Sequence, residues 1–110
     1  MAFDESLGER IRDALGKTRG IVEKKMFGGL VFMLDGHMLV GVWKDSLIAR
    51  VGADEAEIAL EKPHVRVFDV TGRSMKAWVM VEPDGLDENR QVKQWVQRAM
   101  QFVETLPPKS

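Results

Sequence analysis

The chain has 110 residues, with 16 lysine and arginine residues against 17 aspartate and glutamate residues and a formal net charge of -1. This length predicts a single domain, 1–110, and 45% hydrophobic residues are enough to line its core without a disulfide or a metal ion. The chain contains no cysteine, which excludes disulfides, thiolate metal sites and thiol nucleophiles, and its near-zero charge excludes a general attraction to nucleic acid or membranes.

The first segment of the chain predicts a short amphipathic helix. Its apolar residues recur at steps of three and four: Phe3, Leu7, Ile11, Ala14 and Leu15. Asp4 can cap the start of this helix, and Gly16 marks its end. The acidic start does not match a secretory signal, and the apolar run 30–34 is far shorter than the ~20 residues of a membrane-spanning helix. We therefore expect a cytoplasmic protein that does not bind membranes.

Three apolar runs predict the strands of an antiparallel meander: 30–34, 38–42 and 47–51. Asp35 and Gly36 separate the first two runs and predict a hairpin, because both central residues of a type I′ turn need positive φ. Extended structure is also expected before the pair Gly28-Gly29, in the stretch 21–27. The glycine pair is expected to let this strand bulge or to let another backbone come close.

The second half of the chain predicts a short helix, two strands and a long helix: 55–60, 65–70, 75–81 and 87–106. Asp87 is the expected N-cap of the long helix, and a short tail, 107–110, follows it. The order α-β-β-β-α-β-β-α predicts the α+β class, with an antiparallel sheet of about five strands and helices packed on one face.

The search for catalytic chemistry finds no convincing site. His37 follows the hairpin and is expected to be solvated, and His64 lies in a loop, so neither predicts a catalytic base or a metal ligand. The stretch from Thr71 to Lys76 offers hydroxyls and cations, but it lacks the spacing of a phosphate-binding loop, and a hairpin turn at Gly72 explains it better. We expect no catalytic residues, no metal, no cofactor and no enzymatic activity. An enzyme that binds phosphate or a small molecule at 71–76 remains an alternative.

A second alternative is a nucleic-acid-binding accessory protein with a local basic surface. Its cations would be Lys25, Arg50, Arg66, Arg73 and Lys76. Trp43 or Trp78 could then stack on bases, although both are better explained as core residues. The seven methionines lie mostly at predicted strand positions and are expected to fill irregular space in the core.

The stretch 25–38, which reads Lys-Met-Phe-Gly-Gly-Leu-Val-Phe-Met-Leu-Asp-Gly-His-Met, resembles the signature of the TfoX/Sxy family, in its N-terminal domain. Further matches follow in the family's order: 47–52, Phe68, 71–76, 78–81 and 95–96. The resemblance implies a curved antiparallel sheet with helices against it, similar to secretion-chaperone-like folds. It also implies a role in competence as a transcriptional co-regulator alongside the cyclic-AMP receptor protein. Family members usually carry a C-terminal helical domain, and we expect this chain to be a stand-alone N-terminal domain.

We therefore expect a non-catalytic, cytoplasmic regulatory module that works by binding a protein partner. The expected contact residues lie at a sheet edge and a loop: Phe27, Gly28, Gly29, Arg73 and Lys76. An exposed edge strand also predicts a homodimer.

Overall fold

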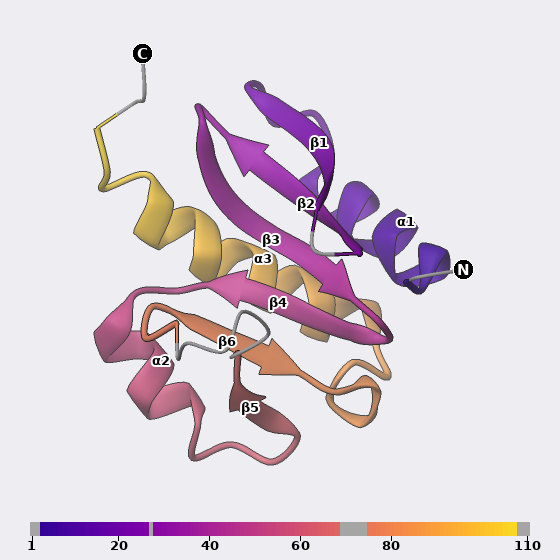
Figure 1. The fold of residues 1–110 in the computed structure, drawn as a ribbon, viewed down its shortest axis with the longest axis vertical. Helices are drawn as coiled ribbons and strands as arrows, with labels where there is room; N and C mark the ends of the chain where they lie inside the picture. The colour runs from indigo at the N-terminus through magenta and orange to yellow at the C-terminus, as the bar shows by residue number, and fades with distance from the viewer. Residues whose placement is uncertain (1–2, 27, 69–74, 108–110) are drawn as a thin grey trace.

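The computed structural model describes residues 3–26, 28–68 and 75–107. Helices and sheet occupy separate layers within them, as Figure 1 shows. The helices are α1 (Glu5–Leu15), α2 (Ala53–Ala59) and α3 (Asn89–Val103), with the short 3-10 helix η1 (Pro83–Gly85). The strands are β1 (Ile21–Met26), β2 (Gly29–Leu34), β3 (His37–Trp43), β4 (Ser46–Arg50), β5 (Val65–Val67) and β6 (Trp78–Val81). The predicted α+β class is confirmed.

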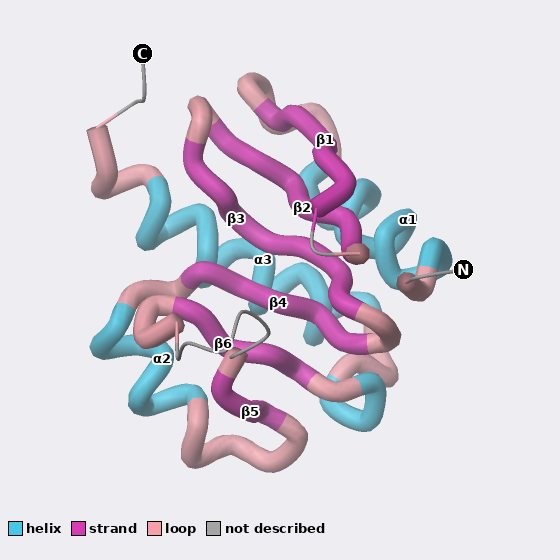
Figure 2. The backbone as a smooth tube through the Cα atoms, viewed as in Figure 1, coloured by secondary structure: helices cyan, strands magenta, loops and turns pink. Residues whose placement is uncertain are grey.

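The strands form one antiparallel sheet in the order β1-β2-β3-β4-β6-β5, as Figure 2 shows. The meander predicted from the runs 30–34, 38–42 and 47–51 is present as β2, β3 and β4. The sheet has six strands, one more than the predicted element order contains. The additional strand is β1, which lies before the glycine pair and pairs with β2 along its whole length. The last two strands are shorter than expected, since residues 75–77 form a turn that leads into β6.

Local backbone geometry confirms the predicted hairpin between β2 and β3. Asp35 has φ of 51° and Gly36 has φ of 85°, the left-handed conformations that a type I′ turn requires. The glycine pair acts in two different ways. Gly28 has φ of 75°, whereas a Cβ on Gly29 would lie 2.3 Å from the carbonyl oxygen of Val42. Gly29 therefore allows the close approach of β3 that the sequence suggested.

All three helices pack on the same face of the sheet and share one core with it. Fully buried members of this core include Ile11 from α1, Val96 from α3, and Phe32, Val40 and Leu47 from the strands. Complete burial of an aliphatic side chain of this size contributes about 1.5–3 kcal/mol to stability. The prediction that helices cover one face is confirmed.

The starts of α1 and α3 are held by side chains. The Asp4 carboxylate accepts a hydrogen bond from the backbone N–H of Leu7 at 3.2 Å, which confirms the predicted cap of α1. At α3 the cap is Glu88 and not Asp87, so the predicted N-cap is wrong by one residue. Glu88 is fixed there by a reciprocal capping box, in which its backbone N–H donates to the Gln91 side chain at 2.7 Å.

Candidate functional site

The sheet has a second face on which none of the described helices packs, and we name it the helix-free face. It is turned toward the viewer in Figures 1 and 2, with α1 and α3 behind the sheet. Side chains alternate between the two faces along each strand. The helix-free face is therefore assembled from alternate positions of β1, β2, β3, β4 and β6, while the intervening residues of β2, β3, β4 and β6 contribute to the main core.

A small apolar cluster lies on the helix-free face over β4 and β6. Its buried members are Ile48, Phe68 and Trp78, and the rings of Phe68 and Trp78 are 5.7 Å apart and tilted by 49°. Partly exposed residues surround them: Met38, Trp43, Met75, Ala77 and Met80. None of the described helices covers this cluster, and its rim residues are partly exposed.

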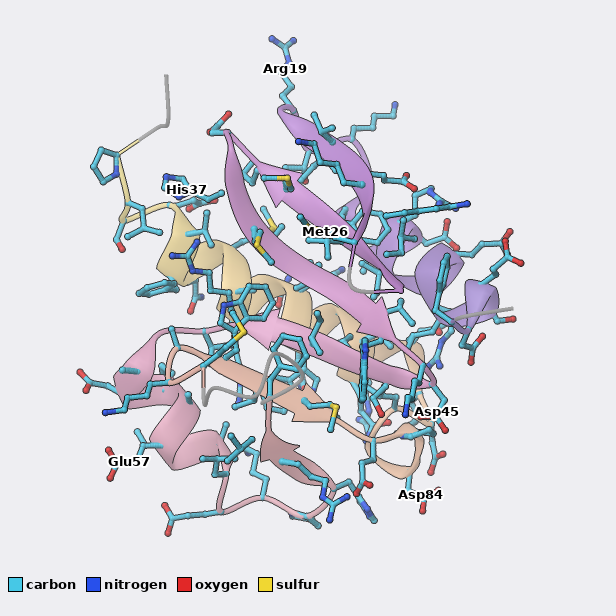
Figure 3. All side chains as sticks on the ribbon, viewed as in Figure 1. Arg19, Met26, His37, Asp45, Glu57 and Asp84 are labelled. Carbon is cyan, nitrogen blue, oxygen red and sulfur yellow. The ribbon has the colours of Figure 1, made fainter. Side chains whose placement is uncertain are left out.

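The methionines gather on this face, which the sequence did not indicate. Met33 lies directly opposite Met38 across the β2–β3 pair, while Met26 lies on β1 opposite Gly29, at the other end of β2. All three are partly exposed, and Figure 3 shows sulfur atoms in front of the sheet, with Met26 labelled. The expectation that methionines fill the core therefore holds only in part: Met38 and Met80 pack against the apolar cluster, and all the strand methionines stay partly exposed. Unbranched, polarizable methionine side chains suit an adaptable protein-binding surface.

A groove between α2 and the β5–β6 side of the sheet continues this surface. Its cavity volume is about 240 Å³, and its lining includes Leu60, Val67, Met75, Lys76 and Trp78. Leu60 is 38% exposed and Val67 is 41% exposed, although both are large hydrophobic residues. Pockets for drug-sized ligands span about 300–1,000 Å³, so this groove suits one or two anchoring side chains better than a cofactor.

The predicted contact residues lie in two separate places. Gly28 and Gly29 lie at the connection between β1 and β2, while Lys76 lines the groove beside α2. The strands β3 and β4 lie between β2 and β6, so the structure does not bring these positions together. Phe27 and Arg73 lie outside the described residues. The binding role of the five residues stays a prediction.

The cations proposed for nucleic acid are dispersed. Lys25 lines a depression beside α1 with three glutamates, and the Arg50 guanidinium lies 5.8 Å from the ring centre of a phenylalanine of α3. Arg66 pairs at 3.5 Å with a glutamate that follows β6, and Lys76 lies by α2. Arg73 is outside the described residues. The four described cations therefore form no single patch.

The two histidines have different surroundings. His37 is only 8% exposed, and its Nε2 donates to the carbonyl oxygen of Pro107 at 2.6 Å, so the expectation of a solvated residue is wrong. Figure 3 shows His37 beside the segment that follows α3. His64 is exposed, as expected for a loop. Within the described ranges, no group of three or more His, Asp or Glu side chains is placed to hold a metal ion.

One ion pair connects the helical layer to the sheet edge. The Arg12 guanidinium on α1 donates two hydrogen bonds of 2.7 Å to the Glu23 carboxylate on β1. These bonds lower the pKa of Glu23 and raise the pKa of Arg12. Both side chains remain exposed, so water and salt screen the pair.

A comparison with known families gives a match that agrees with this architecture. The family model of the TfoX N-terminal domain matches residues 13–103, which is most of the chain. The chain belongs to the TfoX N-terminal domain family. No curated protein and no solved structure matches it.

For this TfoX N-terminal domain, the match covers α3 and all six strands of the sheet, together with the end of α1. It includes the methionines of the helix-free face and the groove beside α2. No helix in the described part of the chain is long and apolar enough to span a membrane. The stretch Thr71–Ser74, which carries the alternative phosphate-binding hypothesis, lies outside the described residues.

Proposed function

We propose that this TfoX N-terminal domain is a non-catalytic regulatory module that binds a protein partner through its helix-free face. The observation that carries the proposal is the set of partly exposed methionines on this face: Met33 opposite Met38, with Met26 on β1 and Met80 on β6. Apolar side chains exposed together on a sheet face mark an interaction surface, because their burial by a partner removes apolar area from water.

The groove beside α2 supports this proposal. It offers exposed Leu60 and Val67 around a floor that includes Trp78, which is an arrangement suited to an anchoring apolar side chain. Lys76 at the same groove can donate to a carboxylate or a carbonyl group of the partner. The predicted contact residue Lys76 thus has a place in the proposed interface.

We place this activity in the cytoplasm and in the regulation of transcription, by analogy with the competence regulators that carry this domain. The dispersal of the described cations favours contact with a protein over direct contact with nucleic acid.

The test is affinity capture from the native cytoplasm with wild-type protein and with Met33→Lys and Met80→Lys variants. Each variant places a charge on the helix-free face, so partners bound there are lost. Lys93→Glu, on the exposed side of α3, is the matched control and keeps them. Circular dichroism and thermal unfolding verify that all four proteins are folded. Equal capture by the wild type and the methionine variants would contradict the proposal.

A further inference from the structure

The outer edge of β1 is an unpaired strand edge within the described part of the chain. β1 is the terminal strand of the sheet, and no described strand pairs with its outer border; α1 packs mainly against α3 and β3 and meets β1 through the Arg12–Glu23 pair (Figure 1). Val22 on this strand is 54% exposed, one of the most exposed large hydrophobic residues described. Open strand edges are templates for pairing with another chain.

The hydrogen-bond pattern fixes which backbone groups are free. Asp35 donates its backbone N–H to the carbonyl oxygen of Gly20 at 3.3 Å, and bonded and non-bonded pairs alternate along an antiparallel ladder. The β1 residues that bond to β2 are therefore Val22, Lys24 and Met26. The other β1 residues direct their backbone N–H and C=O groups outward, to the free edge of the sheet: Ile21, Glu23 and Lys25.

The side chains of β1 divide between the two faces in the same alternation. Glu23 bonds to Arg12 of α1 and Lys25 lines the depression beside α1, so both lie on the helical side. Val22 and Met26, together with Lys24 between them, therefore lie on the helix-free face.

We infer that β1 pairs antiparallel with β1 of a second copy of this chain, around a two-fold axis that passes through Lys24. In this register the outward backbone groups of Glu23 meet those of Lys25 in the second copy, and the reverse pair forms by symmetry. The two copies then share one continuous sheet, with both helical layers on the same side.

The side chains of this register are complementary. On the helical side, each Glu23 lies opposite a Lys25 of the second copy, which gives two opposite-charge pairs. On the helix-free face, each Val22 lies opposite a Met26, which covers two exposed apolar side chains. Cross-strand pairs of these kinds stabilise a sheet, and only the two Lys24 side chains on the axis repel each other.

The neighbouring registers of the β1–β1 pair bring less favourable side chains and backbone groups together. With the axis on Glu23, two carboxylates meet each other, and Val22 and Ile21 lie opposite lysines. If one β1 is shifted along the other by one residue, the backbone groups that point to the free edge in one copy meet groups that already bond to β2 in the other. The side chains of the helical side in one copy then lie opposite those of the helix-free face in the other. The sequence of β1 thus selects the register centred on Lys24.

Cysteine cross-linking tests this register cleanly because the chain contains no cysteine. In a non-bonded antiparallel pair the opposing Cα atoms are about 4.5 Å apart, which a disulfide can bridge. We expect Lys24→Cys to form a covalent dimer with diamide as oxidant. Glu23→Cys and Lys25→Cys are the matched controls, and they stay largely monomeric because like residues are offset along the strands.

Sedimentation velocity over a range of concentrations provides a second measurement without any cross-link. Val22→Lys removes both apolar pairs and lowers the association constant by about tenfold. Lys24→Thr removes the central repulsion and raises the constant. Equal cross-linking of all three cysteine variants, or no cross-linking of a folded Lys24→Cys variant, overturns the inference. So does wild-type protein that stays monomeric at high concentration. Both measurements use this chain alone, so the dimer can fail its test while the proposed binding of a protein partner stands, and the reverse.

Discussion

His37 and Pro107 are 70 positions apart in the chain, and the imidazole Nε2 of His37 donates to the Pro107 carbonyl oxygen at 2.6 Å. This bond fastens the segment after α3 to the start of β3. The ring is buried whereas Pro107 is exposed, so the hydrogen bond is partly shielded from water.

His37→Ala should lower the free energy of unfolding by about 1–3 kcal/mol, because it removes the hydrogen bond to Pro107 and the packing of a buried ring. Urea denaturation measures the loss. His64→Ala is the control, since His64 is exposed, and it should change stability by less than about 0.5 kcal/mol. Equal effects of the two substitutions would show that the bond to Pro107 contributes nothing.

Gly29→Ala should be much more damaging than Gly28→Ala. A Cβ at Gly29 would lie 2.3 Å from a backbone oxygen of Val42, so two paired strands must separate, at a cost of about 3 kcal/mol or more. At Gly28 no atom lies within 4 Å of the added Cβ, and only the positive φ opposes it, at about 1–2 kcal/mol. Chemical denaturation of the two variants gives the ranking, and the reverse ranking would refute it.

Glu23→Gln should lower the free energy of unfolding only at pH values where the Glu23 carboxylate of the wild-type protein is charged. The two hydrogen bonds from Arg12 lower the pKa of Glu23, so the pair stabilises the fold above the pKa of the unfolded carboxyl. This contribution disappears as the pH falls through the lower pKa of the folded state. Because both side chains are exposed, the difference from wild type at about pH 7 should be less than about 1 kcal/mol and should shrink with salt.

Thermal unfolding of dilute wild-type and Glu23→Gln protein at about pH 7 and at about pH 2 checks this prediction. Dilution keeps Glu23 free of contacts with a second copy. A stability difference that is unchanged at the acidic pH would mean that the ion pair is not its source.

Leu60→Asp should weaken partner binding and leave the fold intact. Leu60 lines the groove beside α2 and is 38% exposed, so an aspartate there stays hydrated but cannot hold an apolar anchor. Ile58→Asp is a close control, because Ile58 lies on α2 and is 57% exposed but does not line the groove. Titration of a captured partner should show weaker binding for Leu60→Asp alone. Comparable losses for both variants would move the contact from the groove to the outer side of α2.

Local signals in the sequence predicted the local structure well. Asp35-Gly36, the Asp4 cap and the Gly16 end of α1 depend on a few neighbouring residues, and each was identified. β1 was only partly anticipated, because its centre reads Glu-Lys-Lys and an edge strand tolerates charges that a central strand does not. Its register and its free edge depend on pairing with β2.

The candidate surface was harder to predict. Helices on one face were predicted, but the run Leu30–Leu34 is apolar at both alternating positions, so it did not indicate which side chains face away from the helices. His37 is buried by a contact with a distant residue, which no local pattern encodes. The dispersal of Arg50 and Arg66 likewise follows from the sheet order and from partners on other elements.

The positions of the three tryptophans allow their fluorescence to report on partner binding. Trp43 and Trp78 belong to the apolar cluster of the helix-free face, while Trp95 packs in the main core with the Arg98 guanidinium 4.9 Å from its ring centre. Since the chain has no tyrosine, its ultraviolet emission comes almost entirely from these three rings. A phenylalanine in place of Trp95 leaves two fluorophores on the proposed binding surface, whose emission then follows docking without any attached dye.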